Sequence, residues 1–278
     1  MKKILTIQDI SCVGKCSLTV ALPIISAFGI ETAVLPTAVL STHTAFESFT
    51  FKDLTDDLTE ISENWKKQKI GFDALYTGYL GSFKQLDIVS QIFDDFKTQD
   101  NFILVDPVMA DNGCLYKGFD QKFVDSMAKL CKKADIIVPN LTEASYMLHT
   151  PYIQSGYDEK YVQDLLIKLT NLGCKTAILT GISFEKSKIG AYGYDSVNKK
   201  FFSYFREHLP QSFHGTGDVF ASALCGALSL DNSIDKALEI AVDYTVESIN
   251  LTIKNPDHVW YGVEFERAIP YLVERIKK

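Results

Sequence analysis

The amino-acid sequence predicts an α/β fold of three layers, α-β-α, with a mainly parallel central sheet and helices on both faces. Two observations support this prediction. Short runs rich in Ile, Leu and Val alternate with amphipathic helical patterns, a rhythm typical of parallel strands joined by crossover helices. The apolar runs also end in the same manner, in glycine, proline or polar residues, as strands do where they leave a sheet.

The individual elements follow from these patterns. Five buried strands are predicted, in the segments KILTIQD (3–9), DALYTGY (73–79), NFILVDP (101–107), ADIIVPN (134–140) and KTAILTG (175–181). Amphipathic helices are expected at 56–67, 83–96 and 160–172. The segment 188–205 predicts a hairpin with its turn at 195–199, at one side of the sheet. After Gly215 the pattern is mostly helical to the end, with an interruption near 255–258.

Length and composition limit the class of protein. The 278 residues contain no linker, repeat or low-complexity tract, so a single domain over 1–278 is predicted. With 46% hydrophobic and 23% charged residues, the chain is typical of soluble globular proteins. A net charge of −7 argues against nucleic acid or an anionic membrane as the main partner. The first apolar run breaks at Gln8, too early for a signal peptide or a membrane span, so a cytoplasmic location is expected.

Polar residues follow several of the predicted strands. Asp106 ends one strand, Asn140 and Glu143 follow the next, and Thr180 and Gly181 end a third. In a parallel sheet these ends share the edge where open α/β folds bind ligands. The alternative is that such residues merely stop strands. It explains the carboxylates of Asp106 and Glu143 less well, because turns do not require them.

A glycine-rich turn precedes a predicted helix in the segment SFHGTGDVFASALCGAL (212–228). Gly215 and Gly217 allow the backbone to approach a ligand closely, and the unpaired N–H groups of a helix start attract anions such as phosphate. Asp218 beside such a site could take a proton from a substrate hydroxyl. The alternative is that Asp218 only favours the helix start, an effect of about 0.3–1 kcal/mol.

Carboxylates at the strand ends are also candidate metal ligands. Phosphoryl transfer from a nucleotide requires a divalent cation, and Mg²⁺ is usually held by one or two carboxylates with waters and phosphate oxygens. Asp106, Asp111 and Glu143 are the candidates, with an ion pair or a helix cap as the alternative role for each. The segment VGKCS (13–17) resembles the end of a P-loop, but it lacks the required first glycine and has Cys16 after Lys15, so we reject that interpretation.

Six ordered motifs resemble those of the pyridoxal/pyridoxamine kinases, a branch of the ribokinase-like superfamily. They are TIQDIS, LSTHTAF, TGYLGS, DPVMADNG, VPNLTEA and HGTGDVFASAL, and they span residues 5–228. The resemblance implies a ribokinase-like kinase domain, often a homodimer, that uses ATP and Mg²⁺. It would phosphorylate the 5′-hydroxymethyl group of a B6 vitamer.

The resemblance also implies roles for residues that match the motifs. Asp218 matches the general base, and Gly215, Thr216 and Gly217 match the anion hole. The positions that match the acceptor site are Asp9, Ser11, His43, Thr44 and Tyr79. Those that match the nucleotide and metal site are Asp106, Asp111, Asn140, Glu143, Thr180 and Gly181, with Gly217 contributing to the phosphate site. Residues 111–119 resemble a flap.

Two positions depart from the family pattern. Asp9 stands where relatives commonly have a serine that contacts the pyridine, and a carboxylate cannot act as a hydroxyl donor. We therefore expect Asp9 to favour an acceptor with a cationic amine, such as pyridoxamine, the alternative being that Asp9 caps a local turn. Val138 replaces a threonine that helps relatives bind a monovalent cation, which leaves a K⁺ requirement open.

Two other functions remain open. A hydroxymethylpyrimidine kinase of thiamine metabolism would share the fold and the GTGD turn, although STHT and TGYLGS favour the B6 branch. A catalytically silent relative that binds a vitamer or nucleotide is the second alternative. Asp218 and Glu143 argue against it, because a protein that only binds needs no base.

Overall fold

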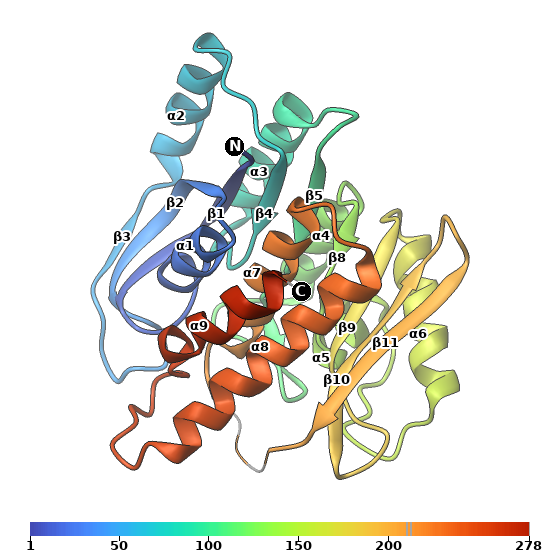
Figure 1. Ribbon diagram of the computed structural model, residues 1–278. Helices are drawn as coiled ribbons and strands as arrows, with labels where there is room; N and C mark the ends of the chain where they lie inside the picture. Colours follow the sequence, from blue (N-terminus) through green and yellow to red (C-terminus); the bar gives the residue numbers. More distant parts are fainter. Residues whose placement is uncertain (210, 212, 278) are drawn as a thin grey trace. The chain divides into compact units, whose positions relative to one another are not determined.

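The computed structural model describes residues 1–209, 211 and 213–277 (Figure 1). Its sheet strands are mostly parallel and helices pack on them, which confirms the predicted α/β class. The chain forms two compact units, the first made of Met1–Tyr76 and Leu209–Lys278 and the second of Thr77–His208. The single domain over 1–278 stays a prediction. Ser212 of the glycine-rich segment lies outside the described residues.

The first unit contains the start and the end of the chain. Its elements are β1 (Lys3–Val13), α1 (Leu18–Ala27), β2 (Glu31–Thr42), β3 (Phe51–Asp53), α2 (Thr55–Lys67), β4 (Ala74–Thr77, at the boundary), α7 (Thr216–Ser229), α8 (Ile234–Lys254) and α9 (Phe265–Ile276). The strand order is β4-β1-β2-β3. β1 and β2 are parallel and β3 runs antiparallel to β2, so residues far apart in the sequence meet on one sheet.

Apolar side chains of β1 and α1 form the core of this unit. Ile4, Leu5 and Ile7 of β1 and Ile24 and Ile25 of α1 are fully buried, and each such side chain contributes about 1.5–3 kcal/mol by leaving water. Helix α1 contacts β1, β2, α7 and α9, and α8 lies against α7 and α9. This packing fixes the start of α7 relative to the end of β1.

The second unit contains the middle of the chain. Its elements are α3 (Phe83–Phe96), β5 (Phe102–Val105), β6 (Ala110–Asp111), β7 (Cys114–Leu115), α4 (Gln121–Cys131), β8 (Ile136–Ile137), α5 (Leu141–Met147), α6 (Glu159–Asn171), β9 (Thr176–Ile182), β10 (Lys188–Asp195) and β11 (Lys200–Glu207). The strand order is β11-β10-β9-β8-β5. β5, β8 and β9 are parallel, and β10 and β11 pair antiparallel.

Side-chain caps start the helices of the second unit. Ser82, Asp120 and Asp158 each accept a hydrogen bond from the backbone N–H three residues later, at the starts of α3, α4 and α6. Asn140 and Glu143 form a reciprocal capping box at the start of α5. Such caps satisfy N–H groups that have no partner within the helix.

Most of the predicted elements are confirmed. The hairpin forms as expected, with Asp195 of β10 opposite Lys200 of β11, and the last helical region is interrupted between Lys254 and Phe265. β2 lies outside the predicted strands; it contains Pro36, and proline normally argues against a strand in the interior of a sheet. Among the helices of the described residues, none combines the length and apolarity needed to cross a membrane.

Candidate active site

The glycine-rich turn forms the start of α7 in the first unit. Gly215 is the N-cap residue and has a φ of 79°, in the left-handed region. A Cβ atom at this position would lie 1.8 Å from the carbonyl oxygen of Lys15, so only glycine fits here. Thr216, Gly217 and Asp218 occupy the first turn of the helix, where the backbone N–H groups have no intrahelical partner.

Asp218 has a strongly perturbed carboxyl group. Withdrawal from water raises its pKa to about 7. The backbone N–H of Ser17 lowers the pKa of the carboxyl group, whereas the charge of Asp9 raises it. A carboxyl group with a pKa near neutrality is suited to take a proton from an alcohol, because its ionised form is available and still basic.

Asp9 lies on β1 and is 4% exposed. Its carboxylate accepts hydrogen bonds from the Ser11 hydroxyl at 3.0 Å and from the Ser17 hydroxyl at 2.5 Å. Burial raises its pKa, and the two hydroxyl donors oppose that change. The structure thus brings together Asp9, Ser11 and Asp218 of the predicted site. The segment that connects them is 13–17, which was rejected as a P-loop.

His43 and Thr44 follow β2 in the same unit. The backbone N–H of Ala45 donates to His43 Nδ1 at 3.2 Å, so the proton of the neutral ring is on Nε2, which donates to the Tyr261 carbonyl at 3.1 Å. Burial lowers the pKa of His43, and the nearby His214 ring, 5.5 Å away between centroids, lowers it further. His43 is therefore a fixed neutral group, while Thr44 is exposed beside it.

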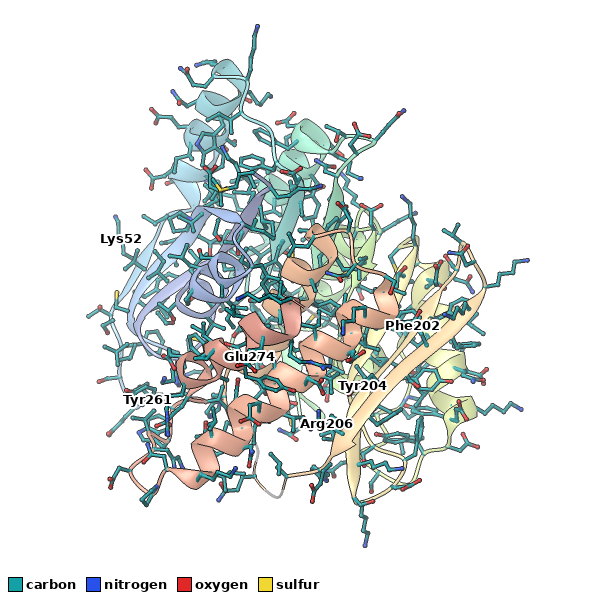
Figure 2. All side chains as sticks on the ribbon, in the orientation of Figure 1. Lys52, Phe202, Tyr204, Arg206, Tyr261 and Glu274 are labelled. Atoms are coloured by element: carbon teal, nitrogen blue, oxygen red, sulfur yellow. The ribbon has the colours of Figure 1, made fainter. Side chains whose placement is uncertain are left out.

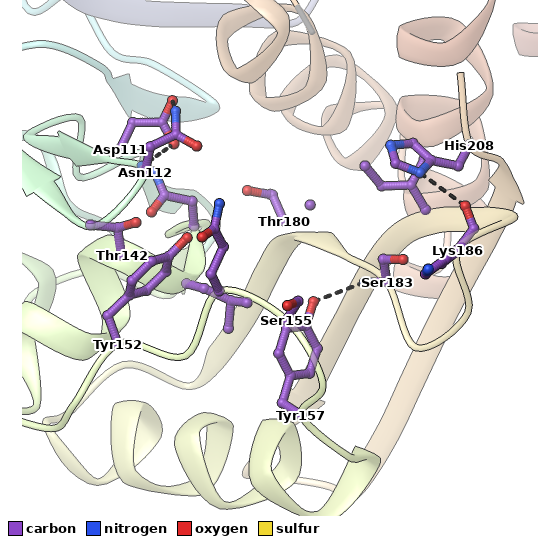
Figure 3. A pocket seen from close by; sticks show the side chains of 15 residues that line it. Asp111, Asn112, Thr142, Tyr152, Ser155, Tyr157, Thr180, Ser183, Lys186 and His208 are labelled. Atoms are coloured by element: carbon purple, nitrogen blue, oxygen red, sulfur yellow. Dashed lines mark hydrogen bonds between the residues drawn. The ribbon is translucent and has the colours of Figure 1, made fainter. Parts of the chain in front are cut away.

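A cavity of about 790 Å³ lies in the second unit, within the usual size range of small-molecule sites (Figure 3). It is lined by Asp111, Asn112, Asn140, Leu141, Thr142, Tyr152, Gln154, Ser155, Tyr157, Thr180, Gly181, Ser183, Lys186, Ile189 and His208. Asn140 and Thr180 are joined by a parallel bridge between the ends of neighbouring strands. Four predicted residues, Asp111, Asn140, Thr180 and Gly181, therefore share one cavity.

Two hydrogen bonds shape the wall of this cavity opposite Asp111. The Ser183 N–H donates to the Tyr157 hydroxyl at 3.0 Å, and His208 Nδ1 lies 3.1 Å from the carbonyl oxygen of Lys186 (Figure 3). Lys186 is the cation among the lining residues that the structure describes. A cation, tyrosines and strand-end amides together suit a ligand that has both a flat ring and an anionic group.

The three predicted metal ligands have different surroundings. Glu143 is 3% exposed, and its two carboxylate oxygens accept backbone N–H bonds from Met109 at 3.1 Å and Asn140 at 2.9 Å. Burial raises its pKa to about 8. Asp106 is buried where β5 ends, and Asp111 is exposed. The described residues contain no group of three or more His, Cys, Asp or Glu side chains at metal-binding spacing, although carboxylate oxygens are the donor type that Mg²⁺ prefers.

Tyr79 belongs to the second unit, where it follows β4. Its ring lies 5.8 Å from that of Phe119, tilted by 33°, and Phe119 stacks on Phe123 of α4 at 3.9 Å. The predicted flap, 111–119, overlaps the small β6–β7 hairpin, which begins at Ala110. Its glycine turn is tied down, because Gly113 N–H donates to Thr142 and the Tyr146 hydroxyl donates to the Gly113 carbonyl.

Several residues at these sites were missed in the sequence analysis. Lys15 contacts the glycine-rich turn and Ser17 lowers the pKa of Asp218, although the segment 13–17 is not a P-loop. A serine directly before an apolar helical pattern was the available signal. His208, to which the sequence analysis assigned no function, lines the cavity with Tyr152 and Tyr157, and no local pattern marks these residues.

Comparisons with known proteins place the chain in a family. A Bacteroides thetaiotaomicron protein provisionally described as a phosphomethylpyrimidine kinase, solved with pyridoxal, is 39% identical over 98% of this chain and 95% of that one, with a TM-score of 0.92. Pyridoxal kinase from Lactobacillus plantarum is 28% identical over 99% and 97% of the two chains, with a TM-score of 0.90. The hydroxymethylpyrimidine/phosphomethylpyrimidine kinase of Bacillus subtilis is 24% identical over 82% and 81%. The sequence model of the phosphomethylpyrimidine kinase family matches residues 24–260, and the chain belongs to that family.

Proposed function

We propose that this protein is an ATP-dependent kinase that phosphorylates the 5′-hydroxymethyl group of a B6 vitamer, with Asp218 as general base. The observation that carries the proposal is the carboxyl group of Asp218, with its pKa near 7, in the first turn of a helix that begins with a Gly215 turn. The similarity to a protein solved with pyridoxal, at 39% identity, supports the B6 branch.

In the proposed reaction, Asp218 and the backbone N–H groups of residues 215–217 have different roles. Asp218 accepts the proton of the acceptor hydroxyl while the hydroxyl oxygen forms a bond to the γ-phosphorus of ATP. The bond from that phosphorus to the β–γ bridging oxygen breaks, and ADP leaves with the electron pair. The backbone N–H groups of Gly215, Thr216 and Gly217 stabilise the negative charge of the transferred group.

ATP is proposed to occupy the cavity of the second unit. Asn140, Thr180 and Gly181 line it at the strand ends, and Lys186 supplies a positive charge. Mg²⁺ would neutralise the phosphate charge, held by oxygens of Asp106 and Asp111, with Glu143 fixing the backbone of Met109 and Asn140 around them. Because Val138 offers no side-chain oxygen, activity with and without K⁺ tests the monovalent-cation requirement.

The acceptor is proposed to bind through Asp9, Ser11, His43 and Thr44 of the first unit, and the match of Tyr79 to the acceptor site stays a prediction. Asp9 is buried and its carboxylate accepts hydrogen bonds from two hydroxyl groups, so a cationic donor on the ligand would balance its charge. The aminomethyl group of pyridoxamine is such a donor, and the aldehyde of pyridoxal is not. We therefore propose pyridoxamine as the preferred vitamer. Separately, the family resemblance leads us to propose that the enzyme is a cytoplasmic homodimer.

A hydroxymethylpyrimidine kinase is the second candidate. The family model and the Bacillus subtilis relative favour it. Its substrate is also an aromatic alcohol, and its ring amino group could donate to Asp9 as well. The two candidates therefore differ in the acceptor that is turned over rather than in the chemistry of Asp218.

The deciding experiment measures ADP release with ATP and Mg²⁺ against pyridoxamine, pyridoxal, pyridoxine and hydroxymethylpyrimidine. Turnover of the B6 alcohols that is lost in Asp218→Ala supports the proposal. A preference for hydroxymethylpyrimidine would replace it with the second candidate. Binding of an alcohol without ADP release would indicate a catalytically silent relative.

A further inference from the structure

The segment between β1 and α1, residues 14–17, lies against several parts of the first unit. The carbonyl oxygen of Lys15 contacts Gly215, where an added Cβ atom would approach it to 1.8 Å. Gly14 lies under the His43 ring, since an added Cβ atom would be 2.9 Å from His43 Cδ2. Any displacement of this segment would therefore be transmitted to the glycine-rich turn.

The side chain of Lys15 is held by the start of α9. Its Nζ lies 2.7 and 2.6 Å from the two carboxylate oxygens of Glu266 and 5.4 Å from the centre of the Phe265 ring. Its stem packs on Gly262, where an added Cβ atom would be 2.4 Å from Lys15 Cβ. The Lys15 side chain is only 18% exposed, so this pair is better ordered than most surface ion pairs.

Ser17 connects the same segment to the two carboxyl groups. Its backbone N–H lies close enough to Asp218 to lower the pKa of that carboxyl group, and its hydroxyl donates to Asp9 at 2.5 Å. Ser17 has a φ of 52°, which is uncommon for a non-glycine residue and requires support from its surroundings. The contacts of Lys15, two residues earlier, are available to supply that support.

We propose that the Lys15–Glu266 ion pair is a positioning device for the general base. The start of α9 holds residues 14–17 so that the Lys15 carbonyl stays against Gly215 and the Ser17 N–H stays close to Asp218. Lys15 and Glu266 are thus positioning residues that act through the backbone of Ser17. This inference rests on the proposed function for its effect on rate, but the effect of Ser17 on Asp218 can be tested without turnover.

Ionisable groups on other elements of the first unit could also influence Asp218. Asp9 on β1 acts on Asp218 directly, and the Cys16 thiol is influenced by both carboxyl groups. Helix α1, which packs on α7, has no charged side chain. On α8, the buried carboxylate is that of Asp243, which Arg275 of α9 binds.

The direction in which the pKa of Asp218 moves in Glu266→Gln distinguishes a positioning role from a direct effect of the charge. Glu266→Gln removes a negative charge, and through space this would lower the pKa of Asp218. If instead the ion pair holds Ser17, its loss lets the Ser17 N–H move away from Asp218 and raises that pKa. We expect the acid limb of kcat to move up by about one pH unit and kcat at neutral pH to fall about 10-fold, with less change in KM.

Two variants serve as controls. Glu274→Gln removes the same charge from an exposed position on the same helix (Figure 2) and should leave both the limb and kcat unchanged. Lys15→Arg retains the ion pair and should behave like the wild type. If Glu266→Gln fails to fold, Glu266→Asp, which shortens the reach to Lys15, should give a smaller shift in the same direction.

A ¹³C NMR titration of aspartate carboxyl groups reads the same pKa without any substrate, with Asp218→Asn to assign the signal. An upward shift in Glu266→Gln supports the positioning role even if no alcohol is turned over. An unchanged or downward shift, or an equal shift in Glu274→Gln, overturns it. Lack of wild-type turnover would instead count against the proposed function.

Discussion

The pH dependence of the reaction is the most direct consequence of the surroundings of Asp218. Its pKa of about 7 lies about three units above the ordinary 3.8 of an aspartate. If Asp218 is the general base, as we propose, only its ionised carboxylate accepts the hydroxyl proton, and about one tenth of the enzyme should be active at pH 6 and about one hundredth at pH 5. An aspartate with an ordinary pKa would be almost fully ionised at both pH values.

The assay is kcat/KM for the acceptor at saturating ATP and Mg²⁺, from pH 5 to 9, with pyridoxine and pyridoxal in parallel. A fall in kcat/KM at low pH that has the same midpoint with both acceptors belongs to the enzyme rather than to an ionising group of the substrate. We call this fall the acid limb. Asp218→Ala should lower kcat/KM by about 10²–10⁴ and abolish the limb. Asp57→Ala, which removes an exposed carboxylate from α2, should change neither. A limb near pH 4, or one that persists in Asp218→Ala, would refute the assignment of the base.

Three further predictions concern single positions. Asp9→Ser should lower the ratio of kcat/KM for pyridoxamine to that for pyridoxal by about 10-fold or more, because a charged hydrogen bond is lost for one vitamer only; an unchanged ratio would remove Asp9 from the acceptor site. Gly215→Ala should abolish activity through the 1.8 Å contact with Lys15, whereas Gly29→Ala, with a similar φ of 76° and open space around it, should cost only backbone strain; equal kcat values for the two variants would contradict this. Glu143→Ala should lower the free energy of unfolding by about 3 kcal/mol in urea denaturation, because two buried N–H groups lose their acceptor; a change no larger than that of exposed Glu185→Ala would count against this role.

Local patterns made much of the fold predictable. The hairpin at 188–205, the break after α8 and the helix after Gly215 are confirmed, because turn residues, apolar periodicity and helix starts are encoded by neighbours in sequence. β2 escaped prediction because Pro36 weakened its pattern. β8, predicted within 134–140, is reduced to Ile136–Ile137, since only backbone pairing decides where a strand ends.

The residues of the candidate site likewise form two groups, those that a short motif marks and those that no motif marks. The sequence by itself identified residues whose chemistry is visible in a short motif: Asp218 behind its glycine turn, the Asn140–Glu143 capping box as a strand-end pair, and Asp9 as a departure from the family pattern. Their types and order are sufficient to predict a phosphotransferase. No motif of this kind marks the residues that line the cavity from 152 to 157 and at 208.

Only the tertiary structure decided how these groups are tuned. The pKa of Asp218 depends on burial, on Ser17 and on Asp9. Lys15, in the loop that carries Ser17, pairs with Glu266, which is 251 residues away in the sequence. Desolvation and charge act through space, over distances that the order of residues does not specify. The sequence therefore determined which groups are present, and the packing of α1, α7 and α9 in the first unit determined which of them act on one another.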